Sequence, residues 1–296
     1  MSTLYLPRLG SFSTDADNTQ SVVVDCIPHK GHQTMGEAQV GGLTSSPSHS
    51  CTRIKWDVPH DLNRDEEAQH ELEPFTPFLR SLWRIDFSIG VVEISMLANS
   101  MSCINEICVN SCAMLLQRMF EMNHPETASK CAVMSTCNIR DLREGVRDEL
   151  LWQMVYHTEY WKENKEIWII PIHRQYNDSG HWVLCVAYMK TRKLLLFDSL
   201  GDSGWTYDVA AAVALIRRLC AISPRALDNS VSPTQEWVAY PALVHSVQTN
   251  NHDCGIWVLA SIAAVLKGFH TTGLTETDMP GFRRWLHNVV LSMRAA

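Results

Sequence analysis

Apolar positions recur along the chain with two different periods, and each period predicts a different kind of element. From Ile104 to Met119 they return every three or four residues, which predicts a helix with one stripe facing a core. The same spacing predicts helices over 141–160, with Asp141 as the N-cap, and over 209–219. The nearly all-apolar run Cys254–Leu266 predicts a helix that is buried on every side.

Short runs rich in branched and aromatic residues lie between these helices. They predict strands over 167–172, 181–188 and 193–197, with a polar loop over 174–180. A last helix is expected to have Pro280 in its first turn. Helices, then a group of short strands, then helices again is the order of an α+β domain.

The first part of the chain lacks such periodicity. Residues 1–78 are rich in Ser, Thr, His and Gly, with a charge run over 64–73, so we expect a variable, largely disordered segment there. Residues 79–296 are expected to form one folded domain.

Composition excludes several classes of function. The net charge of -7 gives no global basic field for nucleic acid. No apolar run approaches the roughly 18 residues of a membrane span, and the first residues do not resemble a secretory signal. We therefore expect an intracellular protein, in the nucleus or cytoplasm, that binds neither nucleic acid nor membrane.

The ten cysteines show no framework spacing and no CxxC pair. They are expected to be reduced thiols. Five cysteines between residues 103 and 137 are the best candidates for a zinc site, but their spacing is not that of metal ligands. We therefore expect no metal and no cofactor. The five cysteines are Cys103, Cys108, Cys112, Cys131 and Cys137.

Two residues near the predicted hairpin could act together. His181 opens one strand and Asp198 follows the next, and any loop with an even residue count places both on one face of the sheet. A turn centred on Met189 and Lys190 would set them directly opposite each other. A turn shifted to 191–192 would offset them by four residues. A carboxylate beside an imidazole orients the ring and stabilises the imidazolium.

A third feature precedes the buried helix. Cys254 would place its sulfur at a helix N-terminus, where the helix dipole and a nearby protonated histidine favour the thiolate. Gly255 allows close approach of a substrate backbone. Gln248 could donate its amide N–H to a developing oxyanion, together with the backbone N–H of Cys254. We interpret His252, His173 and His245 as residues without a catalytic role.

In combination these motifs resemble the ubiquitin-like-protein-specific cysteine proteases, the SUMO-protease type that shares a core with the adenovirus protease. The resemblance rests on His181-Trp182, on Phe197-Asp198-Ser199-Leu200 with its Asp 17 residues after the His, and on Gln248 six residues before Cys254 in a D-C-G context. The segment 104–110 resembles the L-N-D stretch that opens a helix in that family. The sequence Ile-Pro-Ile-His at 170–173, just upstream of His181, is similar to the sequence at this place in fungal members of the family.

The resemblance implies a short mixed or antiparallel sheet flanked by helices, with the nucleophile at the N-terminus of a buried helix. It implies Cys254 as nucleophile, His181 as general base and acid, Asp198 as the orienting carboxylate and Gln248 as the oxyanion donor. Substrate contacts are implied for three further residues: Trp182, which helps to line a narrow tunnel for a Gly-Gly tail, Asn105 and Gly255.

One position departs from the family pattern. Cys103 stands where the family has a tryptophan on the other side of the tunnel. Glu106 stands where the L-N-D stretch of the family has its aspartate. This departure leaves the choice of substrate open more than the chemistry.

The resemblance therefore implies a monomeric cysteine peptidase, without cofactor, that hydrolyses the peptide or isopeptide bond after the C-terminal Gly-Gly of a ubiquitin-like modifier. It implies a SUMO-like protein as that modifier. Two alternatives remain at this point. One is a catalytically inactive module that binds ubiquitin-like proteins, and the other is a Cys-dependent acyltransferase on the same scaffold.

Overall fold

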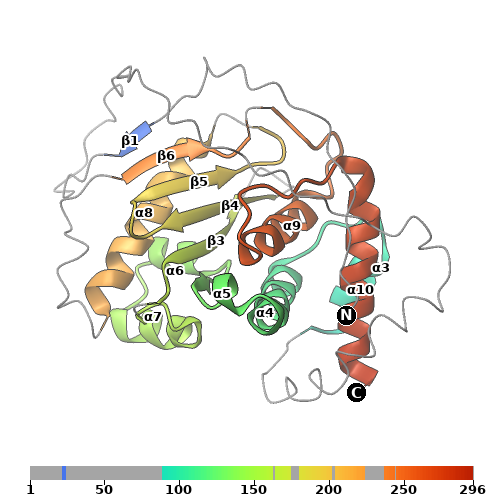
Figure 1. The fold of residues 1–296 in the computed structure, drawn as a ribbon, viewed down its shortest axis with the longest axis horizontal. Coiled ribbons are helices and arrows are strands. Elements are labelled where there is room, and N and C mark those ends of the chain that lie inside the picture. Colours follow the sequence, from blue (N-terminus) through green and yellow to red (C-terminus); the bar gives the residue numbers. More distant parts are fainter. Residues whose placement is uncertain are drawn as a thin grey trace.

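A computed structural model describes residues 22–24, 89–162, 164–174, 180–201, 204–223, 237–243 and 245–295 (Figure 1). The charge run predicted over 64–73 lies outside these residues, as does nearly all of the segment predicted to be disordered. Val22–Val24 is the exception, because these residues form a strand of the sheet.

The described residues form an α+β fold, as predicted. Its strands are β1 (Val22–Val24), β2 (Cys131–Val133), β3 (Ile167–Arg174), β4 (His181–Tyr188), β5 (Lys193–Phe197) and β6 (Trp237–Pro241). Its helices are α3 (Val91–Ala98), α4 (Glu106–Asn123), α5 (Pro125–Ala128), α6 (Asn138–Arg143), α7 (Asp148–Val155), η3 (Tyr156–Thr158), α8 (Trp205–Ile222), α9 (Cys254–Leu266), η4 (Glu276–Asp278) and α10 (Met279–Ala295).

The described strands make one mixed sheet in the order β1-β6-β5-β4-β3-β2. The pairs β3–β4 and β4–β5 are antiparallel, whereas β2–β3 and β5–β6 are parallel. Parallel pairs need long crossover connections, and α8 lies in the one between β5 and β6. Figure 1 shows the strands as a twisted layer with helices packed around it.

Side chains alternate across β4 and separate two cores. Trp182, Leu184 and Val186 pack with α4 and α9 in one core, and Val183, Cys185 and Ala187 pack with α8 in the other. The run 254–266 is buried at every position, as its sequence predicted. The cysteines of α4 at 108 and 112 are buried in the first core, where they pack as small apolar residues.

The helix predicted over 141–160 is wrong in its extent. The structure has α6, then a turn at Gly145 with φ of 69°, then α7. Asp141 lies inside α6 and is not an N-cap. The left-handed conformation at Gly145 ends the first helix, because that backbone shape cannot continue a right-handed helix.

The hairpin between β4 and β5 has a register that neither predicted turn gives. Tyr188 pairs with Lys193, so four residues, 189–192, form the connection. In this register residue 200 is the position opposite His181, and Asp198 lies two residues before that position. A displacement of two preserves the face, so the prediction that His181 and Asp198 share one face is correct.

Two helices close the far end of the molecule. In Figure 1, α10 stands beside α3 and α9, and the contacts between these helices place α10 against the start of the folded region. Among the residues that the structure describes, no helix is both long and apolar enough to cross a bilayer.

Candidate active site

The predicted imidazole and carboxylate meet at the end of the sheet. Nε2 of His181 lies 2.7 Å from Oδ1 of Asp198, and both side chains are buried. The backbone N–H of Leu200 donates to the same Oδ1 at 3.0 Å. The carboxylate therefore holds one ring nitrogen of His181 and leaves Nδ1 for another partner.

The thiol of Cys254 lies close enough to the His181 ring to raise the pKa of the imidazole. Cys254 is the first residue of α9 and is 4% exposed. The thiol lies at the N-terminus of α9, and the imidazole lies at the start of β4. Sulfur, imidazole and carboxylate, far apart in sequence, thus form one buried cluster.

The cluster changes the ionisation of its members. Burial alone would lower the pKa of His181, but the hydrogen bonds and negative charges of Asp198 and Cys254 outweigh it and raise the pKa to about 9. Burial would raise the pKa of Asp198, but its bond to His181 and the charge of Arg174 bring it below its ordinary value. An imidazolium ion held by a carboxylate is the favoured state at neutral pH.

This pKa predicts a pH-dependent contribution to stability. A histidine with a pKa near 6.5 in the unfolded chain and about 9 in the folded chain stabilises the fold fully below pH 6.5. That contribution is lost as the pH rises from 6.5 through 9. Urea unfolding at pH 6 and at pH 9.5 should show lower stability at the higher pH, and His181→Gln should reduce the difference. An NMR titration of the ring that gives a pKa near 6.5 would contradict this prediction.

Gln248 is buried beside the loop that follows β5. Its Oε1 accepts from the hydroxyl of Ser199 at 2.7 Å, and its Nε2 donates to the carbonyl oxygen of Asn250 at 2.7 Å. The backbone N–H groups of Val247 and Gln248 donate to the carbonyl oxygen of Ser199. Ser199 thus fixes which end of the Gln248 amide faces the loop before Cys254, a role that the sequence motif did not reveal.

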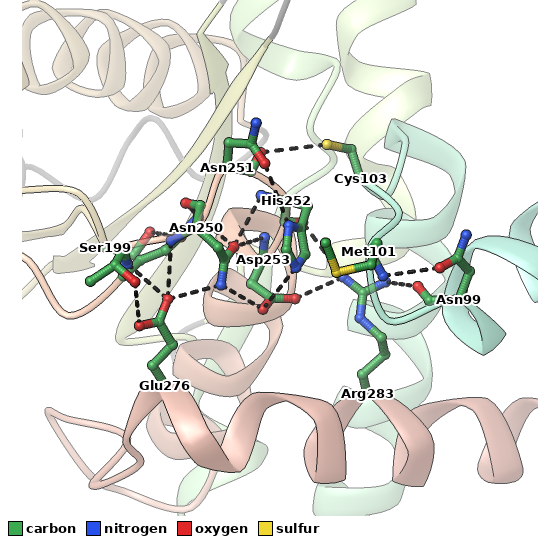
Figure 2. A network of polar contacts seen from close by, with 12 residues as sticks. Asn99, Met101, Cys103, Ser199, Asn250, Asn251, His252, Asp253, Glu276 and Arg283 are labelled. Atoms are coloured by element: carbon green, nitrogen blue, oxygen red, sulfur yellow. Dashed lines mark hydrogen bonds and ion pairs between the residues drawn. The ribbon is translucent and has the colours of Figure 1, made fainter.

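The loop before Cys254 is braced from the C-terminal part of the chain (Figure 2). Oε1 of Glu276, in η4, accepts from the backbone N–H groups of Thr249 and Asn250 at 2.8 and 3.1 Å. Asn250 Oδ1 accepts in turn from the backbone N–H groups of His252 and Asp253, both at 3.0 Å. This arrangement determines the path of the chain into α9.

A buried arginine completes the brace. Arg283 of α10 is 2% exposed, and its Nη2 donates to Oδ1 of Asp253 at 2.9 Å. Its Nη1 donates to the carbonyl oxygens of Met96 and Asn99. Asp253 directly precedes Cys254, so Arg283 connects the start of α9 to α3 and α10.

The three residues predicted to contact substrate have different surroundings. Trp182 is buried, and its Nε1 donates to the carbonyl oxygen of Ile104 at 3.0 Å. Asn105 caps α4 through Cys108, and its Nδ2 donates to Glu93. The polar atoms of Asn105 thus serve the fold, and its substrate contact stays a prediction.

Gly255 is needed for packing within the protein. A Cβ at this position would lie 2.4 Å from Cγ1 of Ile104 and 3.2 Å from Cδ1 of Trp182. No side chain fits there without displacing the side chain of Ile104. The close approach that this glycine permits in the structure is that of Ile104.

Cys103, which stands where the family that the sequence resembles has a tryptophan, lies beside the loop that precedes Cys254. Cys103 is exposed, and its Sγ lies 3.6 Å from the carbonyl oxygen of Asn251. Partial burial, followed by the negative charge of Cys254, raises the pKa of Cys103. A small thiol therefore stands next to the cluster, at the position where the family that the sequence resembles has a tryptophan.

The other histidines are placed as follows. His252 lies in the loop, 3.6 Å from Asp253. His173 is on β3, where its ring packs against Trp182 with centroids 4.3 Å apart. His245 belongs to the segment between β6 and α9.

A thiol against an imidazole that is held by a carboxylate is the arrangement of cysteine-dependent hydrolases and acyl-transfer enzymes. The sequence profile described as the Ulp1 protease family, C-terminal catalytic domain, matches residues 104–289. This chain belongs to the Ulp1 protease family, which is a family of cysteine proteases.

Solved structures have the same fold. The SUMO protease Ulp1 with its catalytic cysteine oxidised to a sulfenic acid shares 16% identity, with a TM-score of 0.53 over 79% of this chain and 97% of that chain. The C-terminal Ulp1 protease domain in complex with Smt3, the yeast ortholog of SUMO, shares 16% identity, with a TM-score of 0.52 over 70% and 85%.

The catalytic domain of the Ulp1-like SUMO protease of Chaetomium thermophilum shares 15% identity, with a TM-score of 0.51 over 76% of this chain and 88% of that chain. At these identities the likeness shows the fold alone. No curated protein matches the chain in sequence.

Proposed function

We propose that this protein is a cysteine peptidase that hydrolyses the peptide or isopeptide bond after the C-terminal Gly-Gly of a ubiquitin-like modifier, with a SUMO-like protein as the preferred modifier. The observation that carries this proposal is the buried contact of Cys254, His181 and Asp198 in a chain of the Ulp1 protease family. The complex of the similar Ulp1 domain with Smt3 supports the choice of modifier.

The reaction uses the proton that the cluster holds on His181. The thiolate of Cys254 attacks the carbonyl carbon of the terminal glycine, and a tetrahedral intermediate forms. The C–N bond then breaks, the leaving amine takes the proton from the His181 imidazolium, and a thioester remains. Water gives a proton back to His181 as it attacks the thioester, and the C–S bond breaks to release the carboxylate product and the thiolate.

Gln248 and the backbone N–H of Cys254 stabilise the oxyanion in this proposal. The hydrogen bond from Ser199 keeps the carbonyl oxygen of Gln248 turned away, so that its amide nitrogen is the end that faces the loop. A donor fixed before the reaction needs no reorganisation when negative charge develops on the substrate oxygen.

Selection for Gly-Gly comes from the narrow space next to Cys254. In this proposal the tail passes between Trp182 and the segment of Cys103 and Asn105, where Ile104 packs against both Trp182 and Gly255. A tail without side chains can pass where larger residues would clash. Because Cys103 is small, tails with a residue larger than glycine should be excluded less strictly than by a tryptophan.

Purified protein incubated with tagged SUMO and ubiquitin precursors, each extended beyond Gly-Gly, tests the proposal. We expect a cut after the second glycine, verified by mass spectrometry, with the SUMO precursor processed faster. Binding of a precursor without any cleavage would favour the inactive binding module. Release of free coenzyme A from an acyl-CoA donor, again without cleavage, would favour the acyltransferase.

Several finer points accompany this function as expectations. The protein is expected to act as a monomer in the nucleus or cytoplasm, and to resemble fungal members of the family. The boundary between a variable segment over 1–78 and a catalytic domain over 79–296 is also a prediction. Gel filtration and imaging of a tagged chain would test the first two.

A further inference from the structure

A buried arginine lies behind the catalytic carboxylate. Arg174 is the last residue of β3, and the register of β3 with β4 sets it directly opposite His181. Its Nη1 donates to Oδ2 of Asp198 at 2.7 Å, and its Nε donates to Oδ2 of Asp208 at 2.7 Å. The side chains of all three residues are at most 9% exposed.

This contact determines how Asp198 presents itself. Arg174 occupies Oδ2, while His181 and the backbone N–H of Leu200 occupy Oδ1. With both oxygens engaged, the carboxylate cannot turn away from the imidazole without breaking a charged hydrogen bond in a buried place. The planar fork of an arginine suits a bridge between two carboxylates, whereas the single ammonium of a lysine does not.

The second carboxylate adjusts the charge. A lone guanidinium next to Asp198 would weaken the hold of that carboxylate on a protonated His181. Asp208, in the first turn of α8, cancels the charge of Arg174 and leaves the negative charge of Asp198 for the imidazolium. Buried charges are expensive, so a triad that served only to attach α8 would be more stable as apolar side chains.

We propose that Arg174 and Asp208 are positioning residues of this active site: Arg174 locks the orientation of Asp198, and Asp208 preserves the charge that keeps His181 protonated. The proposal rests on the function proposed above for His181 and Asp198. Other charged or titratable groups that face this ring are Cys254, from α9, and His173, from β3; Glu106 and Arg140 in turn face His173.

Asp208→Asn tests the charge, because the amide oxygen can still accept from Arg174. We expect the pKa of the His181 ring, followed by NMR, to fall by about half a unit. The alkaline limb of kcat should move down by the same amount, and kcat at pH 7 should fall less than about threefold. Adding Arg174→Gln should return the pKa most of the way, while kcat drops about tenfold with KM unchanged.

Asp148→Asn is the matched control. Asp148, in α7, pairs at 2.8 Å with Arg218, which lies on α8 as Asp208 does. Asp148 is largely exposed and does not contact His181 or Asp198. It should change neither the pKa nor kcat. An unchanged His181 pKa in folded Asp208→Asn would overturn the proposal, as would a double variant with wild-type kcat. Should the double variant not fold, the sign of the shift in Asp208→Asn decides alone.

The NMR titration also separates this proposal from the proposed function. The ring pKa is measured on protein without substrate, so it responds to Asp208→Asn even if no ubiquitin-like precursor is cleaved. A downward shift in a protein that cleaves nothing would support the charge arrangement and contradict the peptidase. Cleavage without any shift would do the reverse.

Discussion

Exchanging Cys254 for alanine will abolish covalent labelling by a ubiquitin-like probe with an electrophilic C-terminus and will reduce precursor hydrolysis by roughly 10⁵-fold or more. The reason is that a thioester needs a thiol, and the other two members of the cluster are an imidazole and a carboxylate. Labelling is read by gel shift, and hydrolysis by the rate of product formation.

Two controls sharpen this experiment. Cys220→Ser changes a thiol of α8 that packs against the other core, and it should keep both labelling and hydrolysis. Cys103→Ser removes the thiol next to the cluster, and labelling should persist because the probe reacts with Cys254. If Cys254→Ala were labelled as strongly as the wild type, the nucleophile would have to be another residue.

Exchanging Arg283 for methionine will lower the free energy of unfolding by about 3–5 kcal/mol. The variant leaves the carboxylate of Asp253 buried without its charged partner, and it removes the donor to the carbonyl oxygens of Met96 and Asn99. Urea denaturation followed by tryptophan fluorescence measures the change.

An exposed pair offers the comparison. Arg118 of α4 pairs with Glu121 three residues later at 3.0 Å, and Arg118→Met should cost less than about 1 kcal/mol. Combining Arg283→Met with Asp253→Asn should cost less than the sum of the two single changes, because the buried negative charge disappears. An Arg283→Met variant as stable as the wild type would show that Asp253 finds another partner or solvent.

Much of this site could be predicted from local sequence. The helical period of apolar residues predicts a thiol at the N-terminus of a buried helix. The two-residue period of strands predicts that His181 and Asp198 share one face of the sheet. The register of the hairpin could not be predicted, because a four-residue turn and a two-residue turn preserve the same alternation of apolar positions. Only the cross-strand pairing distinguishes them.

The roles of the buried charged residues Asp208 and Arg283 could not be predicted for a different reason, although the sequence holds a signal for them. Asp208 lies one turn before Ala212 on the apolar stripe of α8, and Arg283 lies between Met279 and Leu286 on that of α10. A charge on a buried stripe indicates a partner inside the protein. Periodicity cannot name that partner, because Arg174, the partner of Asp208, and Asp253, the partner of Arg283, come from other elements through tertiary contacts.

The braces on the loop before Cys254 have a consequence for biosynthesis. Glu276 and Arg283 follow the nucleophile in the chain, so a ribosome releases the thiol before the residues that hold its loop in place. A nascent polypeptide therefore carries the reactive sulfur without the geometry that gives it a function. The loop before Cys254 can therefore gain these contacts only after η4 and the first turns of α10 have been synthesised.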